Sequence, residues 1–516
     1  MGLLTGAQSG VVRIDGQTLE VETLVRAARY KTRVEVAEEA WERVKRARDC
    51  VEEVIAQEKV VYGINTGFGR FSEVMIDSPQ LRALQTNLIR SHAAGTGPPL
   101  SEETVRAVMI LRANALIKGH SGVRPIVVKT LVDMVNSQVH PVIPSQGSVG
   151  ASGDLAPLAH LSLVLLGEGK ANFWGETLPG LEALNRARLD RVELEAKEGL
   201  ALINGTQLMA AQGCLAIHDG RELARTADAI ASLTVEALRG VGSAFDEKIT
   251  LARPHRGPQL VGRNLRRLME GSSLITMPGQ LRVQDAYSLR CIPQVHGASR
   301  DAIAFVADML QVEINSATDN PLIFADTGDI ISGGNFHGQP LALGLDFLGM
   351  ALAELGSISE RRTDRLLNPV QSGLPAFLAY QGGLNSGMMI LQYTAAALVS
   401  ENKLLASPAS VDSIPTSGGQ EDHVSMGSVA AGKLERMSNN LARILAIELL
   451  CAGQAMDMLG TGDLGRGTKA VFGRLRHEVE PVFADRSMAA EIDQVADLIL
   501  QGEFSRAATN VIGLLE

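Results

Sequence analysis

The chain has 516 residues, of which 45% are hydrophobic and 21% charged. This balance is typical of folded globular proteins and excludes wholesale disorder. Acidic residues outnumber basic ones by 58 to 48, and no run of lysine and arginine is long enough to follow a nucleic-acid backbone. We therefore expect several domain-sized units and no nucleic-acid partner.

Apolar residues recur at three- and four-residue intervals along much of the chain, which predicts helices. The shorter ones are expected over residues 34–58, 101–118, 123–139 and 155–166. Ser101 is suited to cap the second of these. Longer periodic stretches cover residues 206–238, 340–367 and 426–459. Patterns of this length indicate a bundle of long helices in the C-terminal part.

Two short hairpins are predicted among the helices. The first joins residues 11–14 and 19–21 around Asp15-Gly16, and the second joins residues 322–324 and 330–331, each across a turn sequence. The predicted fold class is therefore mainly α, with a few short β-hairpins. A change from shorter to longer helices near residue 200 suggests an N-terminal domain, 1–200, and a long-helix domain, 201–516.

Cysteine positions and apolar runs bear on the compartment. The four cysteines, Cys50, Cys214, Cys291 and Cys451, lie far apart, without the spacing of a metal site, and are interpreted as reduced thiols. Residues 1–16 lack a basic segment followed by an apolar one, and no run of about 18 apolar residues is uninterrupted. We expect a cytoplasmic protein with no metal and no membrane partner.

Glycine is over-represented, at 52 of 516 residues against an average of about 7%. It gathers in polar loops at residues 62–69, 147–154, 204–207, 332–337 and 417–423. Loops of this kind commonly carry binding and catalytic groups, although a glycine can also simply end a helix. None of them matches GxGxxG, Walker, GxSxG or HExxH patterns, which disfavours nucleotide binding, serine hydrolysis and zinc hydrolysis.

The tripeptide Ala151-Ser152-Gly153 can form an electrophile from its own atoms. In a tight turn the Gly153 nitrogen can approach the Ala151 carbonyl carbon, because glycine has no Cβ to obstruct it. Loss of water closes a five-membered ring, and a second dehydration converts Ser152 into a dehydroalanine conjugated to the ring carbonyl. The helix expected over 155–166 would direct its N–H dipoles at this ring. The tripeptide is common, so its interpretation depends on context.

The context resembles aromatic amino acid ammonia-lyases and aminomutases, in the region that forms the 4-methylidene-imidazol-5-one group (MIO). That region is GSVGASGDLAPLAH at 147–160. Six further ordered matches are YGINTGFG (62–69), SHAAGTG (91–97), NGTQ (204–207), QDAYSLRCIPQVHGA (284–298), SGGNFHGQP (332–340) and QEDHVSMG (420–427). The resemblance implies a fumarase/aspartase-like helix bundle with an N-terminal domain that bears the MIO. It also implies autocatalytic MIO formation without an external cofactor, and a homotetramer with shared active sites.

The resemblance also assigns roles to residues within these motifs. Ser152 would supply the electrophile that captures the substrate amine. Tyr62 is the leading candidate for the base that removes the β-proton, although by itself it would be interpreted as a packing residue, and its phenol needs positive potential nearby. Tyr287 matches a second catalytic tyrosine, and the guanidinium of Arg290 suits the substrate carboxylate. The matches that line the site are Asn204, Gln284 and Phe336.

Ring selectivity is expected from His92 and Glu421, and Glu421 is counted among the catalytic residues as well. An imidazole can donate to a carboxylate through its N–H while its second nitrogen bonds another imidazole. A phenyl ring would leave both groups unsatisfied. The resemblance is strongest to histidine-specific members, which implies elimination of ammonia from L-histidine to trans-urocanate, the first step of histidine degradation.

Two departures from the family pattern and three alternatives accompany this interpretation. Ser417-Gly418-Gly419-Gln420 stands in place of Ser-Ala-Asn-Gln, and Ala286 in place of a proline. One alternative is a tyrosine or phenylalanine ammonia-lyase or aminomutase, against which Glu421 argues. A fumarase/aspartase activity is weakly suggested by Gly271-Ser272-Ser273, but the lysine of that loop is missing. The third alternative is an inactive helical scaffold.

Overall fold

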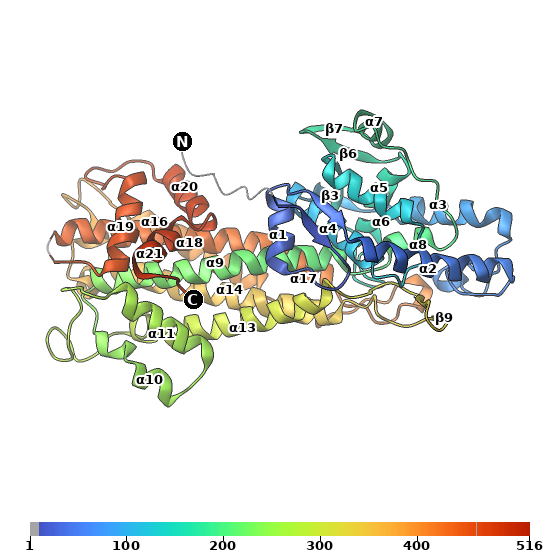
Figure 1. The fold of residues 1–516 in the computed structure, drawn as a ribbon. Helices are drawn as coiled ribbons and strands as arrows, with labels where there is room; N and C mark the ends of the chain where they lie inside the picture. The colour runs from blue at the N-terminus through green and yellow to red at the C-terminus, as the bar shows by residue number, and fades with distance from the viewer. Residues whose placement is uncertain (1–9, 461) are drawn as a thin grey trace. The chain divides into compact units, whose positions relative to one another are not determined.

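Long helices dominate the computed structural model, which describes residues 10–460 and 462–516 (Figure 1). The predicted fold class, mainly α with few short strands, is confirmed. The start of the chain, where no targeting segment is expected, includes residues 1–9, which lie outside the described residues.

Two compact units interleave along the sequence. Unit 1 spans Met1–Leu215, Ala307–Asp346 and Pro408–Gly432, of which residues 10 onward are described, and unit 2 spans Ala216–Val306, Phe347–Ser407 and Lys433–Glu516. Three long helices contribute to both units: α9 (Gln207–Ala237), α13 (Ile292–Glu313) and α14 (Gln339–Leu367). The division into domains at residue 200 stays a prediction.

Unit 1 holds the shorter helices of the N-terminal half and all the described strands. Its other helices are α1 (Val21–Arg29), α2 (Glu38–Ala56), α3 (Leu81–His92), α4 (Glu102–Leu116), α5 (Pro125–Asn136), α6 (Leu155–Leu165), α7 (Gly180–Arg186), α8 (Glu198–Ile203) and α17 (Gly427–Gly432). Its strands are β1 (Val12–Ile14), β2 (Val34–Val36), β3 (Thr96–Pro99), β4 (Val139–Pro141), β5 (Pro144–Gln146), β6 (Lys170–Phe173), β7 (Glu176–Pro179), β8 (Leu322–Phe324) and β9 (Asp329–Ile331). They form sheets of two or three strands.

Among its described residues, unit 2 consists of helices joined by loops and contains none of the strands. Besides parts of α9, α13 and α14 it contains α10 (Glu247–Ala252), α11 (Arg256–Leu268), α12 (Tyr287–Arg290), α15 (Pro369–Ser372), α16 (Met389–Leu405), α18 (Leu434–Leu459), α19 (Arg466–Glu478), α20 (Ala489–Leu500) and α21 (Glu503–Ile512). A buried ion pair joins α14 to α18, since Arg362 donates to both carboxylate oxygens of Glu448, at 2.6 and 2.8 Å. The same carboxylate accepts from Thr234 of α9 at 2.7 Å.

Most of the predicted helices are confirmed, and two of the predicted stretches need correction. The stretches 206–238 and 340–367 correspond to α9 and α14, and Ser101 caps α4 through the Thr104 N–H. The stretch 426–459 is instead divided at Lys433 into α17 and α18, and the stretch 34–58 opens with strand β2 before α2 begins.

One predicted hairpin is wrong and the other is confirmed. β1 pairs in parallel with β2, Val12 opposite Val34, and not with residues 19–21. The reason is local, because Asp15 Oδ1 accepts from the Gln17 and Thr18 N–H groups in a turn that leads into α1. β8 and β9 form the second hairpin, with antiparallel register.

Helix α14 is the one helix in the described part of the chain that is long and apolar enough to cross a membrane by length and composition. Within its most apolar window, 67% of the residues are buried inside the protein. Burial of this extent is also found in core helices of globular proteins.

Candidate active site

All five polar glycine loops contribute to one cavity of about 870 Å³ in unit 1. Of the residues singled out from the sequence, seven line it: Tyr62, His92, Ala151, Ser152, Asn204, Phe336 and Glu421. Gly153 follows Ser152 and lies against Gly205. Tertiary folding therefore brings together groups that are more than 300 residues apart in the sequence.

Three predicted residues do not line this cavity. Gln284, Tyr287 and Arg290 belong to unit 2, at or just before α12, and the Tyr287 side chain is 71% exposed. The Arg290 guanidinium lies over the Tyr287 ring, 4.5 Å from its centroid, in a cation–π contact. No described residue bonds the buried Nε of Arg290. These residues form a separate group with an unsatisfied donor.

Backbone geometry at Gly153 leaves no room for a side chain. Its φ is +74°, and a Cβ built there would lie 2.1 Å from the Gly205 carbonyl oxygen. The next residue, Asp154, donates its N–H to that same oxygen at 2.7 Å, and α6 begins at Leu155. A tight turn followed directly by a helix N-terminus fits the ring-forming tripeptide expected from the sequence.

The carboxylate of Asp154, the residue after Gly153, anchors this turn to the start of α9 and to Ser428. It is fully buried and accepts from the N–H groups of Leu208 and Met209, at 2.9 and 3.1 Å, and from the Ser428 hydroxyl at 2.9 Å. Burial raises the pKa of Asp154 to about 6. Asp154 precedes α6 but caps α9, a role that the sequence analysis missed. The signal in the sequence that could have drawn attention to Asp154 is its position directly after the tripeptide.

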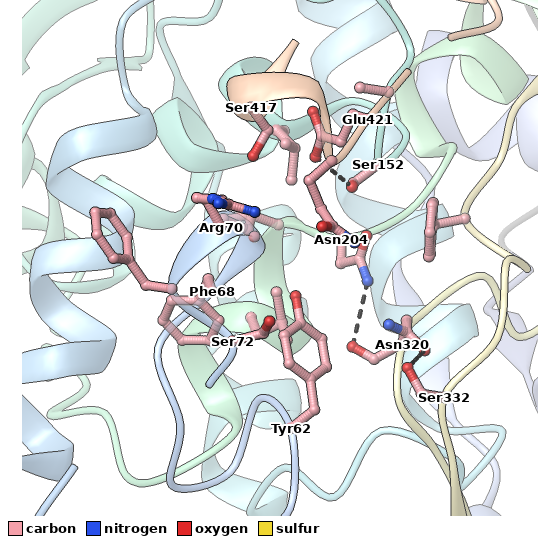
Figure 2. A pocket seen from close by; sticks show the side chains of 18 of the residues that line it. Tyr62, Phe68, Arg70, Ser72, Ser152, Asn204, Asn320, Ser332, Ser417 and Glu421 are labelled. Carbon is pink, nitrogen blue, oxygen red and sulfur yellow. Dashed lines mark hydrogen bonds between the residues drawn. The ribbon is translucent and has the colours of Figure 1, made fainter. Parts of the chain in front are cut away.

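Glu421 is fixed beside the tripeptide by two hydroxyl groups. Ser152 Oγ donates to Glu421 Oε1 at 3.1 Å (Figure 2). Thr416 Oγ1 donates to Glu421 Oε2 at 2.7 Å. The loop that leads to Glu421 turns at Gly418 and Gly419, whose φ angles are +64° and +86°. The departure from Ser-Ala-Asn-Gln thus places glycines where left-handed backbone favours them.

His92 presents a lone pair to the cavity. Its Nδ1 donates to the Leu88 carbonyl oxygen at 2.9 Å, which leaves Nε2 as the acceptor of a neutral ring. Burial lowers the pKa of His92 and so favours this neutral form. His92 and the Glu421 carboxylate therefore both offer hydrogen-bond acceptors.

Tyr62 lines the cavity with its phenol directed among the other side chains (Figure 2). Burial raises the pKa of the Tyr62 phenol, and a backbone hydrogen bond with Gly69 opposes this effect, while the negative charges of Glu421 and Asp319 add to it. The positive potential that a tyrosine base requires must come from groups other than these.

The side-chain amide of Asn204 faces the Ser152 carbonyl. In one orientation Nδ2 donates to Ser152 O at 2.9 Å and the amide oxygen accepts from the Asn320 N–H at 3.0 Å. Figure 2 draws the opposite orientation, in which Nδ2 points to the Asn320 carbonyl oxygen, 3.3 Å away. We adopt the first, because it satisfies both ends of the amide.

Carboxylates outnumber guanidinium groups in the cavity lining. Among the described residues that line it, Glu73, Glu421 and Asp422 are acidic and Arg70 carries the one guanidinium. Arg70 is exposed, in the short 3-10 helix Gly69–Phe71, and was not singled out from the sequence. This balance suits a ligand with amine or imidazole groups and supplies little for a substrate carboxylate.

Comparison with known proteins identifies the family. The family model of aromatic amino acid lyases matches residues 19–477. The chain belongs to the aromatic amino acid lyase family. It is 55% identical to histidine ammonia-lyase from Caldanaerobacter subterraneus subsp. tengcongensis, over 95% of this chain and 97% of that one. With the Alkaliphilus oremlandii histidine ammonia-lyase it shares 53% identity, over 98% and 99%.

Solved structures of aromatic amino acid lyases and aminomutases share the fold. Histidine ammonia-lyase from Trypanosoma cruzi superposes with a TM-score of 0.91 at 43% identity, covering 97% of this chain and 95% of that one. Tyrosine aminomutase from Streptomyces globisporus gives 0.94 at 40% identity, covering 97% and 99%. The family model and the histidine ammonia-lyases at 55% and 53% identity over nearly the whole chain make this protein a carbon–nitrogen lyase. Since both substrate types occur on one fold, side chains in the cavity must decide between them.

Proposed function

We propose that this protein eliminates ammonia from L-histidine to give trans-urocanate, the first step of histidine degradation. The observation that carries the proposal is the hydrogen bond between Ser152 and Glu421 inside a cavity that also exposes the His92 lone pair. It combines the residue that becomes the electrophile with two groups that can recognise an imidazole.

The electrophile is MIO, formed autocatalytically from Ala151-Ser152-Gly153 without an external cofactor. When present, MIO supplies an electrophilic carbon that captures the substrate amine and makes it a better leaving group. The turn at Gly153 fits this assignment because only glycine has room there. Glu421 holds the Ser152 hydroxyl, the group that leaves as water.

His92 and Glu421 recognise the substrate ring. Since both present acceptors, they suit an imidazolium ring that carries N–H groups at both nitrogens. A phenyl or phenol ring would leave at least one of these half-buried acceptors without a donor, which costs binding free energy. This distinction favours histidine over tyrosine and phenylalanine.

Tyr62, which lines the cavity in the same chain as Ser152, is the base. The remaining groups come from other subunits of a homotetramer with shared active sites: Arg290 of a second copy binds the substrate carboxylate and supplies positive potential, and Tyr287 and Gln284 of that copy complete the site. Two observations support association: the acidic cavity lining and large apolar side chains that a single chain leaves exposed on helices of unit 2. The latter are Phe305, Phe347, Met350, Ile390, Tyr393 and Leu404. Exposed apolar surface of this kind commonly marks an interface.

The proposed location is the cytoplasm, with neither nucleic acid nor membrane as a partner. All four cysteines are free, as expected for a reducing compartment.

Two measurements test the proposed function. The mass of the peptide over 147–160 should be lower than encoded by two waters, and Ser152→Ala should restore the full mass less the serine oxygen and abolish activity. Product analysis with L-histidine, L-tyrosine and L-phenylalanine should give urocanate and ammonia from histidine alone. A full-mass peptide in an active enzyme would refute the MIO assignment. Faster conversion of tyrosine or phenylalanine, or a β-amino product, would replace histidine elimination with the lyase or aminomutase alternative.

A further inference from the structure

Arg112, near the C-terminal end of α4, is fully buried beneath the loop that faces Ser152. Its Nη1 donates to the Asn204 carbonyl oxygen and to Gln207 Oε1, both at 2.8 Å. No described residue accepts from its buried Nε and Nη2. A guanidinium so placed directs its charge at the Asn204–Gly205 peptide.

The neighbouring charges do not neutralise Arg112. Asp319 is buried close enough to favour the charged form of Arg112, but its carboxylate bonds the buried Lys197 amine at 2.6 Å. Lys197 and Asp319 therefore pair with one another, and Arg112 remains as an additional cation. Burial lowers the pKa of Arg112 to about 10, so the group is still charged at neutral pH.

The Asn204–Gly205 peptide connects this cation to the Ser152 carbonyl oxygen. Its carbonyl accepts from Arg112, and its N–H, on Gly205, donates to Ser152 O at 3.4 Å. The Asn204 side chain donates to the same oxygen at 2.9 Å. A peptide whose carbonyl bonds a cation is polarised, which strengthens its N–H as a donor. Both donors to Ser152 O thus come from a segment held by Arg112.

We propose that Arg112 is a positioning residue that activates the electrophile: its unpaired guanidinium orients and polarises the Asn204–Gly205 peptide, which then stabilises negative charge on the Ser152 carbonyl oxygen. The inference rests on the proposed function, because it requires Ser152 to become electrophilic. Dehydrated Ser152 offers a β-carbon to a nucleophile, and the electron pair displaced from its double bond moves toward the carbonyl oxygen. Donors aimed at an atom where charge develops are effective in a buried site.

Cyanide addition measures this activation without turnover of substrate. Cyanide forms a carbon–carbon bond to the dehydrated Ser152, a proton from water completes the adduct, and the peptide over 147–160 gains the mass of HCN. The rate of adduct formation, scored only on dehydrated peptide, is compared among wild type, Arg112→Met, Arg112→Gln and Arg112→Lys. Arg106→Met is the matched control, because Arg106 is another buried arginine of α4 whose donors bond the backbone oxygens of Val135 and Ala27.

In the expected result, Arg112→Met and Arg112→Gln slow the addition about tenfold or more, Arg112→Lys retains most of the rate, and Arg106→Met lowers thermal stability without changing the rate. A purely structural role predicts instead that rates stay at the wild-type value while unfolding temperatures fall, and this result would overturn the inference. Equal slowing by Arg112→Lys and Arg112→Gln would also overturn it, since charge would then not matter.

Dehydration itself separates the remaining outcomes. If both neutral variants keep the encoded mass while Arg112→Lys is dehydrated, the charge requirement is supported, because removing the Ser152 α-proton also places negative charge on the carbonyl oxygen. If all three variants keep the encoded mass or fail to fold, the inference is overturned. A full encoded mass of the wild-type peptide refutes the proposed function itself. The mass of that one peptide therefore separates failure of the proposed function from failure of the Arg112 inference.

Discussion

At the scale of single side chains, His92 and Glu421 are the two groups proposed to select the substrate ring. Hydrogen bonds within the chain orient both of them: Leu88 sets the tautomer of His92, and Thr416 holds one oxygen of Glu421. Neither bond depends on a ligand, so the two acceptors are oriented before the substrate binds. A preorganised pair of this kind discriminates among ligands, because a ligand without matching donors leaves one or both acceptors unsatisfied.

Glu421→Gln should lower kcat/KM for L-histidine by about 10²-fold, because a charged acceptor worth roughly 1.5–3 kcal/mol becomes a neutral amide. Glu421 also contacts Ser152, so its substitution can reduce the fraction of chains that are dehydrated. The measured kcat is therefore divided by the dehydrated fraction of the peptide over 147–160. Glu480→Gln, an exposed change in unit 2, serves as the control for loss of one charge. An unaltered kcat/KM in the fully dehydrated Glu421 variant would contradict the assignment.

Asp154 should make stability depend on pH. Its folded pKa of about 6 lies above the ordinary 3.8, so folding favours the protonated form, and this stabilisation is lost as pH rises through 6. Between pH 5 and 7.5 the wild type should lose about 1.4 kcal/mol of unfolding free energy that Asp154→Asn does not lose. Urea unfolding of both proteins at the two pH values measures the difference, and parallel pH profiles would refute it.

Among the elements, α4 shows how a helix buried on all sides holds charged groups. Every residue from Thr104 to Leu116 is buried, including Arg106 and Arg112. Because no face of this helix meets water, both guanidinium groups bond oxygen atoms from distant segments. The position of α4 along its own axis therefore matters for the Asn204 loop.

Ser101→Ala should lower the free energy of unfolding by about 1 kcal/mol, because the Thr104 N–H loses its cap. Ser101→Thr keeps a hydroxyl there and should stay near the wild type in denaturant titrations. Activity per dehydrated site should be unchanged in both variants, since Ser101 lies at the opposite end of α4 from Arg112. Equal losses in the alanine and threonine variants would show that the cap contributes nothing.

At the scale of the whole molecule, the predicted active site is incomplete within one described cavity. Tyr62, Ser152 and Glu421 line it, whereas Tyr287 and Arg290 belong to the other unit and are not among its lining residues. A closed assembly of identical chains can combine the two sets, since each interface repeats the same juxtaposition.

Mixing two inactive variants tests this assembly. Ser152→Ala and Arg290→Met should each be inactive alone, and co-expressed chains should regain activity, up to about a quarter of the sites for random mixing. Restoration arises because some sites receive an intact Ser152 from one chain and an intact Arg290 from another. Lack of restored activity in mixed oligomers, verified by tags on each chain, would show that one chain supplies both residues.

Local sequence accounts for much of the fold and for the chemistry of the site. The 3.6-residue apolar period predicts α9 and α14 because helix hydrogen bonds are local. The Ala151-Ser152-Gly153 motif and Glu421 point to the reaction class from residue types alone. The prediction of the first hairpin is wrong because strand pairing is not local. β1 pairs with β2, which follows α1 in the sequence, and no local pattern indicates which distant strand forms these hydrogen bonds.

The sequence by itself determined the family motifs, the helical architecture and the tripeptide whose proposed cyclisation needs a glycine. Only the tertiary structure decided the state of the groups around that tripeptide. The capping of α9 by Asp154 and the unpaired charge of Arg112 depend on atoms up to about a hundred residues away along the chain. The tautomer of His92 is set within its own helix by Leu88, and only the exposure of Nε2 to the cavity depends on the tertiary structure. Burial and hydrogen-bond partners set protonation and polarity, and both arise only when the loops converge.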